Sequence, residues 1–256
     1  RQEMIRIKDK DKNIDSRKLK DKKGYDLFNT IFFERHKEIL MRSAKNFSLI
    51  ILIIIIVLGV LSFYNNDIHN NIHDFLLNRL GWFVLIMYLI NRGSVVTQAM
   101  FYNCDHAMLR YNFYREPDVI LGLFKKRLTM LIKINLLPAI VIAIGSIVLL
   151  SITTDGSLVI NYIMVPLFII VLSVFFSVHY LVIYYLLQPY NKDLQVRSIS
   201  YTFVSFITLV LTYILSNLVM SSLYFSILGI VLTGAYIIVS LKLVYKYAPS
   251  TFRIHS

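Results

Sequence analysis

Long uninterrupted runs of hydrophobic residues alternate with short polar segments along most of this chain. The run from Phe47 to Tyr64 carries no charged residue and is about as long as a helix needs to cross roughly 30 Å of hydrocarbon. Its apolar residues are consecutive, whereas the strands of a membrane barrel alternate apolar and polar positions. Because backbone amides in lipid must be paired within the protein, these runs predict membrane-spanning helices.

The pattern as a whole predicts an all-α fold, a polytopic membrane helix bundle of about six transmembrane helices. Hydrophobic residues make up 57% of the chain and the mean hydropathy is +0.63, both above the values of a soluble domain. We divide the chain into a basic arm (1–24), an amphipathic helix (25–46), a transmembrane domain (47–245) and a tail (246–256). The six spans are expected at 47–64, 80–101, 130–152, 159–187, 199–219 and 222–243.

Residues 25–46 interleave aromatic and aliphatic side chains with charged ones. This pattern predicts an amphipathic helix that lies at the membrane interface and leads into the first span. The alternative is a simple extension of the first span beyond the membrane. Either arrangement brings the basic arm to the membrane surface.

Basic residues are distributed unevenly around the predicted spans. Of the 27 Lys and Arg residues, fourteen precede Phe47, whereas the three loops on the opposite side contain only Arg79. Since Lys and Arg are retained in the cytoplasm, both termini and the 102–127 loop are expected to be cytoplasmic. The net charge of +12 then reflects topology and anionic headgroups, not nucleic acid, because no aromatic residues interleave with the basic arm. A composition rich in Ile, Asn and Lys suggests the cell membrane of a low-GC bacterium.

The 102–127 loop is polar, aromatic and charged, and it lies between two hydrophobic runs. We predict a helix from Asp105 to Phe113 that Pro117 ends or redirects. Aromatic residues and arginine are enriched where protein surfaces dock, so we expect a partner-binding coupling helix here. The alternative is a loop that lies flat on the headgroups. The candidate partner-binding residues are Asp105, Arg110, Tyr111, Tyr114, Arg115 and Glu116.

Polar and ionisable residues inside spans are costly and therefore mark candidates for function. A snorkelling membrane anchor is the alternative for Arg92, and an interhelical hydrogen bond is the alternative for His179. The candidates for a translocation path are Arg92, Gln98, His179, Tyr180 and Tyr184.

Metal-binding and catalytic signals are weak in this sequence. His69 and His73 have the i, i+4 spacing of two metal ligands on a helix, but a third ligand is not evident and a polar loop is the alternative. We therefore predict no metal, no cofactor and no catalytic residue. The chain has no Gly-x-x-x-x-Gly-Lys-Ser/Thr motif, so it is not expected to bind ATP through a P-loop.

Three groups of segments resemble permease subunits of bacterial ABC transporters of the exporter type. Such permeases have six helices, an interfacial amphipathic helix first, and a coupling helix between the second and third spans. Asn217 to Ser222 is too short for the re-entrant helices that type-2 exporters carry before the last span. The matching segments are 27–36, 101–105 with 109–115, and 175–180 with 184–190.

The resemblance implies a non-enzymatic membrane subunit that exports a peptide, lipid or other amphipathic substrate. It also implies a separate ABC ATPase subunit that binds ATP and Mg²⁺ and receives residues 105–116, and a second permease half. Permeases of this group can be longer chains, which fits a sequence that begins at Arg1. The alternative function is a polytopic membrane enzyme or bacteriocin-immunity protein that acts without an ATPase, in which His69, His73 and His179 would be the sensitive residues.

Overall fold

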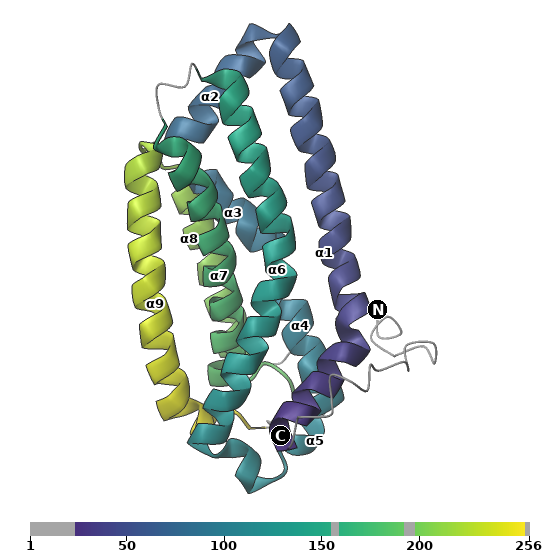
Figure 1. The fold of residues 1–256 in the computed structure, drawn as a ribbon. Helices are drawn as coiled ribbons and strands as arrows, with labels where there is room; N and C mark the ends of the chain where they lie inside the picture. The colour runs from purple at the N-terminus through teal and green to yellow at the C-terminus, as the bar shows by residue number, and fades with distance from the viewer. Residues whose placement is uncertain (1–23, 155–158, 192–197, 254–256) are drawn as a thin grey trace.

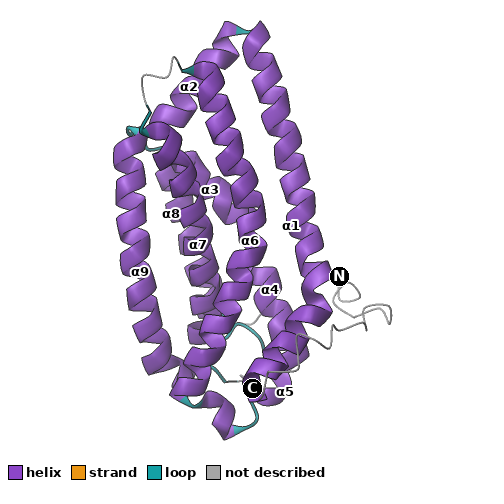
Figure 2. Ribbon diagram, viewed as in Figure 1, coloured by secondary structure: helices purple, strands orange, loops and turns teal. Residues whose placement is uncertain are grey.

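The computed structural model describes residues 24–154, 159–191 and 198–253, which form an elongated bundle of helices (Figure 1). Within these described residues, six helical segments are long and apolar enough to cross a membrane. Figure 2 shows helix as the secondary structure of every labelled element. The predicted all-α membrane bundle is therefore confirmed. The predicted basic arm, apart from Gly24, lies outside the described residues.

The first span belongs to one long helix, α1 (Gly24–Tyr64). The predicted amphipathic segment 25–46 is the first half of this helix, which continues into the apolar segment Leu40–Tyr64 without a break. Figure 1 shows that α1 changes direction partway along its length. The predicted amphipathic segment is therefore helical and leads directly into the first span.

The polar segment after the first span is a helix, α2 (Asn66–Asn78), and not the loop that we weighed from its composition. The Asn65 side chain caps it by accepting hydrogen bonds from the amides of Asp67 (2.8 Å) and Ile68 (3.2 Å). Its apolar residues, spaced three to five positions apart, pack into the bundle. The buried ones are Ile72, Leu76 and Leu77.

The second span is broken, whereas the sequence predicted a single helix over 80–101. It comprises α3 (Gly81–Ile90), α4 (Gly93–Met100), a π-helical turn η3 (Phe101–Asp105) and α5 (His106–Met108). Asn91 ends α3 because its backbone is extended, with φ −60° and ψ 138°. The break falls at Asn91, Arg92 and Gly93, but the mean hydropathy of the whole segment stays high enough to predict one continuous span.

A short 3-10 helix, η4 (Asn112–Arg115), leads into α6 (Pro117–Thr153). The predicted coupling helix over 105–113 is therefore wrong in detail, because Tyr111 is extended and interrupts it. Helix α6 begins thirteen residues before the predicted span. The fixed φ of Pro117 suits the first position of a helix. The charged residues at 125–127 belong to this helix but lie outside its apolar stretch, so the predicted span started later.

The remaining spans are α7 (Asn161–Leu187), α8 (Ile199–Ser216) and α9 (Ser222–Thr251). Helix α7 is the most buried span, and it packs against α6, α9, α3, α4 and α8. The short connection between α8 and α9 contains no further helix, as expected. The start of α1, the connection between α5 and α6 (109–116) and the end of α9 lie at one end of the bundle, which we call the basic end. Helix α2 lies at the other end (Figure 1).

The two ends have separate hydrophobic cores. The core at the basic end joins α1, the second span, α6, α7 and α9, and includes the fully buried residues Phe101, Tyr114 and Phe252. The second core joins α2, α3, α6 and α7. Leu109 and Tyr114 belong to the core at the basic end, so the polar segment 109–116 is anchored in the bundle.

Gly81 lies at a close approach between α3 and the end of α8. A Cβ atom at this position would be 1.9 Å from the backbone oxygen of Leu215. We predict that Gly81→Ala separates α3 from α8 and lowers the free energy of unfolding by about 1–3 kcal/mol, the usual cost of overpacking. Denaturant unfolding in detergent micelles measures this change.

Gly234→Ala in α9 is the matched control, because a Cβ there meets nothing within 4 Å. Removing a glycine from a helix interior is expected to leave the stability unchanged or raise it by about 0.5–1 kcal/mol. Equal unfolding midpoints for Gly81→Ala and Gly234→Ala would contradict the observed packing of α3 on α8.

Candidate functional site

A buried ion pair lies just inside the basic end of the bundle. The Arg127 guanidinium donates to both carboxylate oxygens of Asp105, with Nη2 2.6 Å from Oδ1 and Nη1 2.6 Å from Oδ2. The Asp105 side chain is 0% exposed and the Arg127 side chain is 3% exposed. Such a parallel two-bond geometry is the strongest that arginine and a carboxylate form.

Three tyrosines complete the hydrogen bonding of this pair. Tyr114 donates to Asp105 Oδ1 over 2.6 Å, and Tyr184 donates to Asp105 Oδ2. Arg127 in turn donates to the hydroxyl oxygens of Tyr185 (2.9 Å) and Tyr114 (3.0 Å). Each Asp105 oxygen thus accepts two hydrogen bonds, which compensates for the loss of water around a buried charge. We call these five residues the Asp105 cluster.

The Asp105 cluster links four segments that are distant in the sequence. Asp105 comes from the second span, Arg127 from α6, and Tyr184 and Tyr185 from the end of α7. Tyr114 comes from η4, in the connection between the second and third spans. Burial raises the pKa of the Tyr114 phenol well above its ordinary value, so this hydroxyl remains a hydrogen-bond donor at neutral pH. The cluster therefore fixes the connection to the bundle.

The π-helical turn explains how Asp105 reaches the interior. A π-turn holds an additional residue, which rotates the following side chains around the helix axis. Phe101, Cys104 and Asp105 are all buried as a result. Tyr190, just after α7, stacks on Phe101 with ring centroids 4.9 Å apart. This stacking packs the end of α7 onto the π-turn that carries Asp105.

The end of α9 closes the cluster on another side. Phe252 is fully buried and stacks on Tyr185, with ring centroids 4.6 Å apart and planes inclined by 29°. It also makes an edge contact with Tyr184 at 5.2 Å. Aromatic packing therefore surrounds the ion pair and keeps water away from it.

An exposed tip, which we define as residues 110–116, adjoins the Asp105 cluster and shares the buried Tyr114 with it. Tyr111 is 55% exposed and Phe113 is 42% exposed, and their rings stack with centroids 5.6 Å apart. Arg110 and Glu116 are also exposed, and the Arg115 guanidinium donates to the Asn112 side chain. The tip presents a rigid aromatic pair among charged groups, which is a composition typical of docking surfaces.

The structure divides the predicted partner-binding residues into two groups. Asp105 and Tyr114 are fully buried and hydrogen-bonded to each other, so they support the tip from inside the bundle, and their contact with a partner stays a prediction. Arg110, Tyr111 and Glu116 are exposed, and Arg115 is half-buried at the same tip. A sequence shows that a segment is polar, but it does not show which polar side chains pair with each other inside it.

Arg127 is the residue that sequence reasoning missed. It lies at the end of the predicted 102–127 loop and was not among the candidate residues. The available signal was its position on α6, because it shares a helical face with apolar residues three, four and seven positions away. That buried face comprises Ile120, Leu123, Phe124, Arg127, Leu131 and Ile134. An arginine at such a position requires a buried anion.

The break in the second span is stabilised by side chains from α6 and α7. The Asn135 side chain accepts a hydrogen bond from the Arg92 amide (2.9 Å) and donates to Ser177 (2.9 Å). The Asn91 side chain accepts from the Gly93 amide (2.7 Å). Broken helices are tolerated at membrane depth where neighbouring groups satisfy the freed amides in this way. Gly93 is required here, since a Cβ would lie 2.3 Å from Tyr180 Cβ.

The five candidates for a translocation path do not gather on one surface. Tyr184 belongs to the Asp105 cluster, Tyr180 packs on Gly93, and Gln98 donates to the Tyr102 hydroxyl over 2.8 Å. The guanidinium carbon of Arg92 lies 4.1 Å from the centre of the Phe47 ring.

His179 is half-buried between α7, α8 and α9. Its Nδ1 lies 3.0 Å from the Tyr236 hydroxyl and its Nε2 lies 3.1 Å from Thr208 Oγ1. Both ring nitrogens are therefore engaged in interhelical hydrogen bonds, as in the alternative that we weighed from the sequence.

The histidines of α2 also have partners of their own. His69 Nδ1 lies 3.2 Å from Ser62 Oγ, and His73 Nδ1 lies 2.9 Å from the Thr153 carbonyl oxygen. Within the described ranges, no group of three or more His, Cys, Asp or Glu side chains is placed to hold a metal ion.

We predict that Arg127→Met lowers the free energy of unfolding by about 3–5 kcal/mol, because it leaves the Asp105 carboxylate buried without its cation. Denaturant unfolding in detergent micelles measures the change. The double variant Asp105→Leu/Arg127→Met is expected to recover part of the loss. Apolar residues of similar size can replace a buried pair, but the hydroxyls of the three tyrosines then lose their partners.

Tyr114→Phe is the control that removes one donor and keeps the pair. Its expected cost is about 1.5–3 kcal/mol, the contribution of one hydrogen bond to a charged group. If Arg127→Met and the double variant unfold at the same denaturant concentration, the two side chains are not energetically coupled and the assignment of the ion pair fails.

Comparison with protein-family models, with curated proteins and with solved structures finds no match for this chain.

Proposed function

We propose that this chain is the membrane-spanning permease subunit of an ABC exporter and that a separate ATP-binding subunit docks on its tip, residues 110–116. The observation that carries the proposal is the combination of an exposed aromatic and basic tip with a buried ion pair directly behind it. A movement of the tip would be transmitted to three spans, because Asp105, Arg127 and the α7 tyrosines form one hydrogen-bonded unit.

The position of the tip supports this assignment. It lies between the second and third spans, at the basic end that carries most of the described Lys and Arg residues. Under the positive-inside rule this end faces the cytoplasm, where ATP is available. Tyr111 and Phe113 supply apolar area for a pocket, and Arg110 and Arg115 supply charge for orientation.

The proposal includes a second permease half, identical or different, and an amphipathic substrate such as a peptide or lipid. The exposed apolar faces of α1, α8 and α9 leave room for both lipid and a second half. ATP and Mg²⁺ would be held by the ATP-binding subunit, and the chain described here would contribute the path and the coupling contact.

Co-purification tests the docking site. The tagged chain, extracted in mild detergent from its native host, is expected to retain a P-loop ATPase in a fixed ratio, detected by mass spectrometry and by ATP hydrolysis in the eluate. Tyr111→Ala combined with Arg110→Glu is expected to reduce the retained ATPase about tenfold or more, since interface anchors of these residue types contribute 2 kcal/mol or more.

Arg253→Glu provides the matched control, because Arg253 is exposed at the same end of the bundle but lies outside the tip. This variant makes the same change of charge and is expected to retain the ATPase. A wild-type eluate without any ATPase would overturn the proposal, and equal losses in both variants would show that general charge attraction, not the tip, holds the partner.

A further inference from the structure

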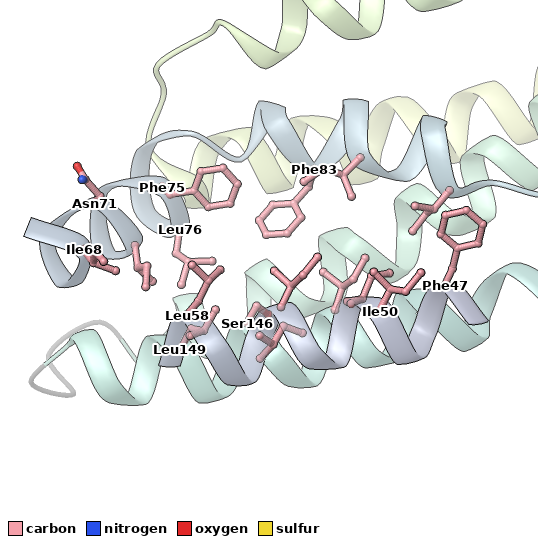
Figure 3. A pocket seen from close by; sticks show the side chains of 17 residues that line it. Phe47, Ile50, Leu58, Ile68, Asn71, Phe75, Leu76, Phe83, Ser146 and Leu149 are labelled. Carbon is pink, nitrogen blue, oxygen red and sulfur yellow. The ribbon is translucent and has the colours of Figure 1, made fainter. Parts of the chain in front are cut away.

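A long apolar cavity lies between α1, α2, α3 and α6 (Figure 3). Its volume is about 630 Å³. Of the side chains that line it, only Asn71 and Ser146 are polar, and the Ser146 hydroxyl donates to the Ala143 carbonyl oxygen. Figure 3 shows Phe47 at one end of the cavity and Asn71 and Ile68 at the other. The cavity is thus an elongated hydrocarbon-like space with a polar group at one end.

The end at Phe47 lies beside an uncompensated cation. The Arg92 guanidinium rests on the Phe47 ring, 4.1 Å from its centre. Among the described residues, no hydrogen-bond acceptor lies at the buried Nε of Arg92. A buried donor without a partner is costly, so this corner of the protein favours a ligand that brings an anionic acceptor.

The geometry points to a binding site for an anionic phospholipid, with one acyl chain in the cavity and the phosphate at Arg92. This inference goes beyond the proposed function, because it requires neither an ATPase nor transport. The two halves of the ligand match two independent observations, the apolar lining and the unpaired Arg92 donor beside Phe47. A neutral lipid would fill the cavity but leave the cation uncompensated.

The size of the cavity agrees with one acyl chain. The α1 residues that line it run from Phe47 to Leu58, about 16 Å along the helix axis. Phe47 lies about 10 Å along α1 from Leu40, where the apolar segment begins, so the long Arg92 side chain can meet a headgroup drawn in from the basic end.

The test is retention of lipid by the purified chain. The protein is reconstituted into vesicles of phosphatidylcholine with a minor share of phosphatidylglycerol and extracted in mild detergent, and the bound lipids are quantified by mass spectrometry. The wild type is expected to retain phosphatidylglycerol well above its share in the vesicles. Arg92→Gln is expected to lower that enrichment about tenfold or more. Lys133→Gln, which removes an exposed cation from α6, is expected to preserve it.

A second pair of variants tests the acyl chain. Ile54→Trp is expected to abolish lipid retention, because Ile54 lines the cavity and the larger side chain fills it. Ile53→Trp makes the same change at a neighbouring residue of similar exposure that does not line it. Both Ile54 and Ile53 are half-exposed, so both variants are expected to fold, which gel filtration verifies.

Three results would overturn the inference. The first is equal enrichment of the two lipid classes in the wild type, and the second is equal retention by Ile54→Trp and Ile53→Trp. The third is displacement of the lipid by an excess of inorganic phosphate, which would mean that Arg92 binds an anion without any contribution from the cavity.

Discussion

The buried pair of Asp105 and Arg127 is the interaction on which the basic end depends. Two opposite charges away from water must be held in good geometry and surrounded by hydrogen-bond partners, or the burial is too costly to persist. The π-turn that carries Asp105, the early start of α6 and the tyrosines at the end of α7 all serve this requirement. Tyr114 extends the same network to the connection between two spans. The tip is therefore exposed at its surface and fixed at its base.

The hydrophobic pattern predicted the number and approximate place of the six spans, because each apolar run in lipid has only a helix as a solution. It did not predict the break at Asn91, where the freed amide of Arg92 is satisfied by Asn135, a residue more than forty positions away. It also did not predict α2, because most residues of this segment are polar. The segment is nevertheless a capped helix with one apolar face. Local pattern determines where helices form, and distant contacts determine where they bend or break.

The candidate site was predicted in part for the same reason. Arg110 and Tyr111 were expected at a surface and are exposed. Asp105 was expected at the same surface, but it is buried against Arg127. The two residues lie in different elements, and no sequence spacing predicts their pairing. Tyr184 was expected on a translocation path, and Tyr190 was noted only as part of a resemblance. In the structure Tyr184 hydrogen-bonds to Asp105 and Tyr190 stacks on Phe101. Pairing of a buried charge is a three-dimensional property that one sequence does not display.

Hydrogen–deuterium exchange of the 109–116 segment, in the protein reconstituted in lipid nanodiscs, tests the central claim most directly. The Leu109 amide donates to the Asp105 carbonyl oxygen and the Tyr114 amide to the Tyr111 carbonyl oxygen, so both are expected to exchange slowly in the wild type. In Arg127→Met both should exchange much faster, while the amides of Arg92 and Gly93 at the helix break keep their protection. Fast exchange across 109–116 in the wild type, or equal exchange in the variant, would contradict the claim that the ion pair fixes the tip to the bundle.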